Sequence, residues 1–222
     1  MADSNRRANR ERFIDWYGKI SRIDNCLVLA GKNLVNVNPV MSGILLLRCQ
    51  YALKAAAGLA LAGQTVEAFV MMRSVLEYAA YGLAIFDQPA LETVFTNRHV
   101  SEADMNAMKS KFRISEVKAV IRRYDARLGD VVDELYERSI SFGGHPNPHA
   151  TFSSMQLETE DGTTAVTQWA MTGDETVLAH ALRSVAQVGL AALFIFQHAF
   201  KAKFELLGIR TEIDALRGEG GL

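Results

Sequence analysis

Residues 65–86, TVEAFVMMRSVLEYAAYGLAIF, decide the fold class of this chain. Between residues 68 and 86 the strongly polar side chains are essentially those of Arg73, Ser74 and Glu77. The stretch is too long for one strand and shows no strict alternation, so it predicts a helix. A helix that is apolar on all sides has to be buried. The sequence therefore predicts a mainly α protein with this helix in its interior.

Helical signals continue on both sides of this stretch. Asn38 can cap a helix with Pro39 in its first turn, and Gly63 can close that helix. Ser101 with Asp104 resembles a capping box, and Asp174 can cap a long last helix. We expect helices at about residues 5–34, 38–62, 65–86, 101–111, 115–136 and 174–207, with a short piece after Pro89 and a possible break at Gly129.

One segment near residues 151–171 differs from the rest. Residues 151–160 and 163–171 are rich in Thr, Val, Trp and Phe, and they flank Asp161-Gly162, a dipeptide typical of type I′ hairpin turns. This register sets Leu157 opposite Val166 and Ser154 opposite Trp169. We therefore predict a single domain over residues 1–222, a helical bundle with one inserted β-hairpin before a long C-terminal helix. The hairpin can serve as a flap over a cleft or contact a second subunit, through Phe152, Trp169 and Met171, and packing of these residues in the core is an equal alternative.

Composition narrows the function classes. The 222 residues are 49% hydrophobic and 22% charged, with 24 Lys and Arg against 25 Asp and Glu. Low net charge with high apolar content excludes a disordered chain and a wholly basic nucleic-acid binder. Cys26 and Cys49 are too few for a disulfide framework and are expected to be small buried residues. The N-terminus lacks the apolar region of a secretory signal, so a cytoplasmic protein is expected.

Two apolar stretches require a comparison with membrane spans. Residues 41–62 are interrupted by Arg48 and Lys54, and residues 185–200 are short and contain Gln187, Gln197 and His198. We interpret both as core helices and expect no membrane association.

Charged residues in apolar helices form the first candidate site. Arg73 and Glu77 are four residues apart and share one face of the predicted helix. Arg48, which stands among leucines, is a natural third member. Buried charges have to be paired, so the group is either a structural network or the lining of a cleft.

Arg138-Ser-Ile-Ser-Phe-Gly-Gly-His145 forms the second candidate site, at the end of a helix and before a proline-stiffened loop. Here the chain resembles the HEPN superfamily, all-α bundles whose ribonuclease members carry an Arg, four to six residues and a His. The resemblance implies metal-independent cleavage of single-stranded RNA by a homodimer. Arg138 would then steady the phosphate, and His145 would move the proton.

A broader likeness covers residues 41–149. The Arg-Ser-Val-Leu-Glu run at residues 73–77 and the later Tyr136 with its His-Pro turn look like an uncharacterised bacterial helical family related to HEPN proteins. On this basis the residues expected to line the cleft are Arg48, Arg73, Glu77, Tyr136 and His149. No cofactor or metal is expected, because the prolines beside His145 and His149 prevent a helical pair of ligands. The alternative is a non-catalytic helical module that binds a protein or a small ligand.

Two further polar features have simpler explanations. Residues 109–127 hold seven Lys or Arg, which could contact phosphates, but an exposed helix face is the favoured explanation, because these cations lie largely opposite the apolar stripe. His180, Arg183, Ser184, Gln187 and His198 share one face of the predicted last helix, and we interpret this face as solvated surface.

Overall fold

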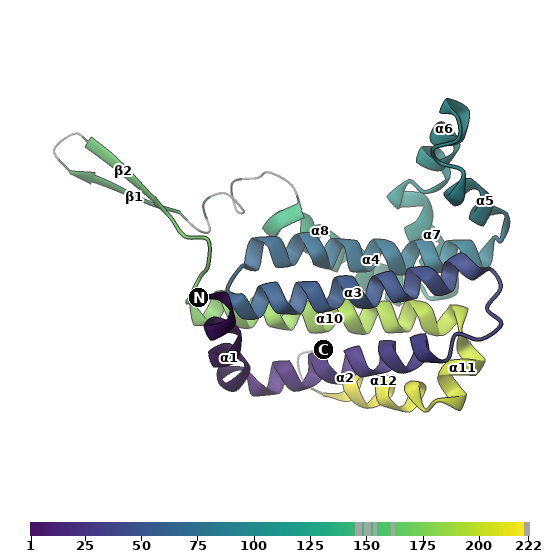
Figure 1. The fold of residues 1–222 in the computed structure, drawn as a ribbon, viewed down its shortest axis with the longest axis horizontal. Coiled ribbons are helices and arrows are strands. Elements are labelled where there is room, and N and C mark those ends of the chain that lie inside the picture. Colours follow the sequence, from purple (N-terminus) through teal and green to yellow (C-terminus); the bar gives the residue numbers. More distant parts are fainter. Residues whose placement is uncertain (145–147, 149–151, 153–154, 161–162, 220–222) are drawn as a thin grey trace.

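The computed structural model describes residues 1–144, 148, 152, 155–160 and 163–219. Most of them lie in helices, and one antiparallel hairpin projects from the helical body (Figure 1). The predicted mainly α fold with one inserted hairpin is therefore confirmed. The elements are α1 (Ala2–Arg12), α2 (Ile14–Lys32), α3 (Val40–Ala62), α4 (Thr65–Asp87), α5 (Ala90–Thr96), α6 (Glu102–Lys111), α7 (Ile114–Tyr124), α8 (Ala126–Ser139), a π-helical turn (Ile140–Gly144), β1 (Met155–Glu160), β2 (Thr163–Gln168), α10 (Glu175–Ala199), α11 (Lys201–Leu206) and α12 (Ile209–Gly218).

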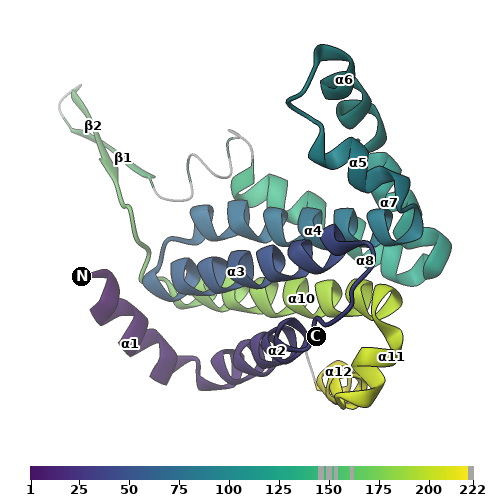
Figure 2. The same cartoon turned by 45° about the vertical axis from the view of Figure 1, so that its right-hand side comes forward.

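Helices α3, α4 and α10 run side by side and form the centre of the bundle (Figures 1 and 2). Helix α2 covers α3 and α10, while α7 and α8 cover α4. Glycines permit close approach at two crossings, because an added Cβ would lie 2.7 Å from Phe196 Cε1 at Gly82 and 2.8 Å from Ile23 Cγ2 at Gly189. Leu76 and Leu83 of α4 are buried, as the apolar sequence of this helix predicts.

The N-terminal segment forms two helices where one was predicted. The chain bends at Phe13, whose side chain is buried, so α1 diverges from α2 (Figure 2). The bend brings α1 to the C-terminal end of α3. There the side-chain amides of Asn5 and Asn9 donate to the carbonyls of Ala62 and Leu61 at 3.1 and 2.9 Å. These carbonyls have no partner within their own helix, so the bend satisfies backbone groups that local sequence patterns do not reveal.

The last predicted helix is also interrupted. Helix α10 ends at Ala199, and Phe200 is buried in the turn that follows. Gly208, with φ of 71°, then turns the chain into α12, which the sequence did not predict. Helix α12 buries Ile209, Ile213 and Leu216 and contacts α2 and α10. Burial of this apolar face stabilises the reversal.

The break between the seventh and eighth helices lies at Asp125 and not at Gly129. The Asp125 carboxylate accepts a hydrogen bond from Leu128 N at 2.9 Å and caps α8. The predicted caps at Ser101 and Asp174 are confirmed, as is the closure of α3 at Gly63. The predicted cap at Asn38 is wrong, because Pro39 directly precedes α3 and no side chain caps this helix. At Ser101, Asp125 and Asp174 short polar residues set the helix starts through their capping ability.

The two cysteines match their predicted environment. Cys26 and Cys49 are both buried and free. Burial also raises the pKa of Cys26 to about 11. Neither thiol is therefore poised for reaction.

By length and composition alone, α3, α4 and α10 are each apolar enough to cross a membrane. In this fold at least half of the apolar window of each helix is buried within the protein. Burial against neighbouring helices gives these segments an alternative to lipid. Location in the cytoplasm stays a prediction.

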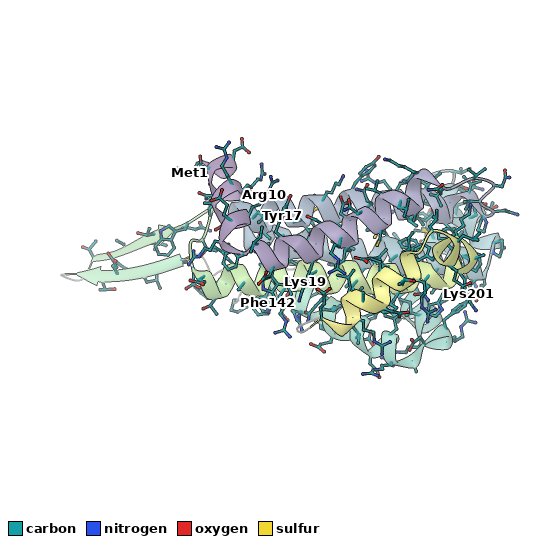
Figure 3. The ribbon with its side chains drawn as sticks, turned by 90° about the horizontal axis from the view of Figure 1, so that it is seen from below. Met1, Arg10, Tyr17, Lys19, Phe142 and Lys201 are labelled. Atoms are coloured by element: carbon teal, nitrogen blue, oxygen red, sulfur yellow. The ribbon has the colours of Figure 1, made fainter. Side chains whose placement is uncertain are left out.

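The hairpin has the predicted register. Leu157 pairs with Val166, and the ladder ends where Met155 pairs with Gln168. Ser154, predicted to lie opposite Trp169, is outside the described residues. Seen from below, the strands extend away from the helices (Figure 3).

Candidate functional site

The predicted pair of Arg73 and Glu77 is formed on α4. Arg73 Nε donates to Glu77 Oε1 at 2.8 Å, and Tyr136 of α8 donates its hydroxyl to the same oxygen at 2.8 Å. The Arg73 and Glu77 side chains are 31% and 30% exposed, so the pair is half-buried, and its hydrogen bonds are those of the structural network that the sequence allows. Burial, followed by the nearby Glu77 carboxylate, raises the pKa of Tyr136 to about 12. Tyr136 is therefore a neutral donor that ties α8 to α4.

Arg48 does not join this pair as a buried charge. Its side chain is exposed, and its Cζ lies 5.6 Å from the centre of the Tyr78 ring. The helix is apolar around Arg48, but one face of α3 is open, and the long side chain reaches solvent along it. The prediction of a buried Arg48 is wrong.

The basic stretch is largely neutralised where it meets α8. Lys118 Nζ lies 2.6 Å from Asp133 Oδ1, and Arg122 pairs with both Asp130 and Asp133. Burial acts to raise the pKa of Asp133, but hydrogen bonds from Lys118 and Arg122 bring it below its ordinary value. Arg123 in turn pairs with Asp87 at 2.7 Å. These three cations are thus engaged in ion pairs that hold α7 against α8 and α4.

Arg138 lies on the other side of α8 from Tyr136, because two residues advance a helix by about 200°. One guanidinium nitrogen donates to Gln187 Oε1 at 2.6 Å, and the other pairs with Glu134 at 2.6 Å. The side chain is only 21% exposed. Arg138 thus joins α8 to α10, and it does not converge with the Arg73–Glu77 pair.

His145 and His149 lie outside the described residues. The approach of His145 to Arg138, on which the ribonuclease hypothesis depends, stays a prediction. Among the residues that the structure describes, no group of three or more His, Cys, Asp or Glu is arranged to hold a metal ion.

The polar face of α10 is not the solvated surface that its sequence predicts. Ser184 is 1% exposed, and Gln187 accepts the hydrogen bond from Arg138. His180 packs against Phe69 and Phe142, with ring centres 5.7 and 5.0 Å apart. This face meets the end of α8 and the π-helical turn, which the sequence did not place beside α10.

The π-helical turn is seated closely on α4. A Cβ added at Gly143 would lie 2.1 Å from the Val66 carbonyl oxygen, so only glycine fits this approach. The Phe69 and Phe142 rings stack with centres 5.2 Å apart. The turn therefore fixes the end of α8, and with it the position of Arg138.

A groove runs between α8, α10 and α12 beside Arg138, with a volume of about 320 Å³. Its floor is apolar and its rim is charged. The apolar side chains are Leu128, Val131, Leu135, Leu190, Ala191 and Phe194, and the polar ones are Asp125, Arg127, Glu134, Arg138, Gln187 and Arg217. This volume is within the range of small-molecule sites.

The charges on the rim do not cancel. Glu134 is paired with Arg138, and the Asp125 carboxylate caps α8. Within the described part of the chain Arg127 makes no ion pair, and Arg217 only lies over the Phe194 ring, with Cζ 5.9 Å from its centre. Arg127 and Arg217 are exposed at the border of the apolar floor, and neither has a carboxylate partner among the described residues.

Among the predicted site residues that the structure describes, only one lines the groove. That residue is Arg138, whereas Arg48, Arg73, Glu77 and Tyr136 do not line it. The sequence analysis placed Gln187 on a polar face of the last helix, but it could not show that α8 covers this face. Arg217 belongs to a helix that the sequence did not predict.

Comparison with protein-family models, curated proteins and solved structures finds no significant match to this chain.

Proposed function

We propose that this protein is a helical ligand-binding module whose groove between α8, α10 and α12 takes a small amphipathic anion. The observation that carries the proposal is the apolar floor bordered by two arginines, Arg127 and Arg217, without carboxylate partners among the described residues. An apolar cavity with a few polar groups at its rim is typical of ligand sites.

The chemistry of the rim defines the ligand class. A carboxylate or phosphate group would replace water around Arg127 and Arg217, and guanidinium groups bind both anions well. An unbranched hydrocarbon tail would lie on Leu190 and Phe194 and remove apolar surface from water. Arg138 would act as a fixed wall, because Glu134 and Gln187 already hold its guanidinium group.

The test is a calorimetric titration with decanoate, decyl phosphate and the neutral control decanol. We expect both anions to bind in a saturable way and decanol to bind more weakly. The Arg127→Gln and Arg217→Gln variants should each lose about tenfold in affinity, because a hydrogen bond to a charged group contributes about 1.5 kcal/mol. The matched control is Arg210→Gln, since Arg210 lies on the same helix but pairs with Asp214 and does not line the groove.

Two results would contradict the proposal. One is equal binding of decanol and decanoate, which would remove the role of the arginines. The other is an affinity loss in Arg210→Gln as large as in Arg217→Gln, which would reflect net charge and not the groove.

We retain the HEPN-like ribonuclease as a second proposed function, favoured by the fixed position of Arg138 at the end of α8. Purified protein should then cleave single-stranded RNA in EDTA, and His145→Ala should abolish cleavage with the helical content unchanged. Intact RNA both in EDTA and with added Mg²⁺ would exclude this activity.

A further inference from the structure

We infer that two copies of this chain associate through the free edge of β2, forming a four-stranded antiparallel sheet from two hairpins. The hairpin stands clear of the helical body in two views at right angles (Figures 1 and 3). A backbone hydrogen bond of 2.9 Å from Thr172 N to Gly63 O holds its base. No described residue of β1 or β2 lines the groove, and the flap role of the hairpin stays a prediction.

The hairpin exposes apolar side chains that a partner strand could cover. Leu157 and Val166 lie directly opposite each other, and each is 59% exposed. All six residues of β2 are exposed. A two-stranded hairpin alone is marginally stable in water, and further strands or packing are needed to stabilise it.

The distribution of charge between the two strands favours β2 over β1 as the edge that pairs with the second copy. Strand β1, MQLETE, carries Glu158 and Glu160, whereas β2, TTAVTQ, carries no charged residue. Proteins usually protect an open edge with charges or proline, and β2 has neither. Pairing β1 with a second β1 would bring glutamates of the two copies close together, and like charges across a ladder are destabilising. Pairing of β2 with β2 avoids this repulsion.

Two-fold symmetry then sets the register. An axis through Val166 places this residue opposite Val166 of the second copy, since directly opposed residues share a face of the sheet. Thr164 would lie opposite Gln168, and the order across the four strands on one face would be Leu157, Val166, Val166 and Leu157. The result is a continuous apolar strip that neither hairpin has alone. The N–H and C=O groups of alternate β2 residues would form the hydrogen bonds between the two edges.

The experiment measures oligomeric state by sedimentation and light scattering over about 1–100 µM protein, a range that brackets micromolar dissociation constants. Wild type should dimerise. Val166→Lys should be monomeric, because it places two lysines opposite each other. The matched control is Leu157→Lys. Leu157 is as exposed as Val166 and lies directly opposite it, but it belongs to β1, away from the proposed interface. The Leu157→Lys protein should stay dimeric.

A charge-complementation arm separates edge pairing from loss of the hairpin. Val166→Glu alone should be monomeric, and an equimolar mixture of Val166→Lys and Val166→Glu should restore the dimer. A monomeric wild type over the whole range would overturn the inference. It would also be overturned by a dimer that persists in Val166→Lys, by equal losses in both lysine variants, or by a mixture that stays monomeric.

Discussion

The hydroxyl of Tyr136 should contribute measurably to stability, because it is the hydrogen bond that joins α8 to the Arg73–Glu77 pair on α4. Tyr136→Phe removes only this donor from a side chain that is 4% exposed. A hydrogen bond to a charged group contributes about 1.5–3 kcal/mol. Glu77 keeps its bond to Arg73 and is 30% exposed, so water can replace the lost donor in part. We therefore expect a loss of about 1.5 kcal/mol, at the low end of that range.

The assay is urea unfolding at neutral pH, with Tyr124→Phe as the matched control. Tyr124 also donates to a carboxylate, Asp87, at 3.1 Å, but it is 40% exposed, so its loss should cost under about 0.5 kcal/mol. For a chain of this length, a loss of about 1.5 kcal/mol lowers the Tm by about 3–6 °C. In a Glu77→Gln background the Tyr136→Phe substitution should cost less, because the two residues interact directly.

High pH provides a second readout of the same bond. The pKa of Tyr136 is raised from 10.0 to about 12 in the folded state. The folded protein therefore holds this proton more tightly than the unfolded chain, so the associated stability is full below pH 10 and is lost as pH rises toward 12. This part of the decline should be missing in Tyr136→Phe. A Tyr136→Phe protein as stable as Tyr124→Phe, with an unchanged decline above pH 10, would refute the reasoning.

Two further predictions concern the core. Gly82→Ala should lower the free energy of unfolding by about 1–3 kcal/mol in urea titrations, because the added methyl would overlap the Phe196 ring; a neutral result would show that the ring moves aside freely. Burial, followed by the charges of Arg138 and Arg183, lowers the pKa of His180 from 6.5, so the folded state resists protonation and stability should fall as pH drops below that value. The fall should be smaller in His180→Gln, and an equal fall in both proteins would assign the pH dependence to other groups.

Local sequence determined the helices with strong periodicity or clear caps. The apolar run of α4, the caps at Ser101 and Asp174 and the Leu157–Val166 register of the hairpin were all predicted and are confirmed. Each depends on interactions between residues a few positions apart, or on a two-residue connection between strands. Such short-range interactions can be predicted from the local sequence.

Long-range packing decided the remaining breaks in the chain. The bend at Phe13 follows from the hydrogen bonds that α1 makes to the end of α3, about fifty residues away in sequence. The turn at Phe200 follows from the burial of α12 against α2 and α10. Neither partner is visible in a local window, so the sequence predicted uninterrupted helices.

In the candidate site, too, local sequence predicted some features and long-range packing decided the others. The sequence singled out Arg138 and the pair of Arg73 and Glu77, because charged side chains in apolar helices need partners. Only the tertiary structure decided that they lie on opposite sides of α8, that Gln187 faces Arg138, and that Arg217 returns to border the same groove. The physical reason is that spacing along one helix fixes which residues share a face, whereas the packing of neighbouring helices fixes which face is buried and what it meets.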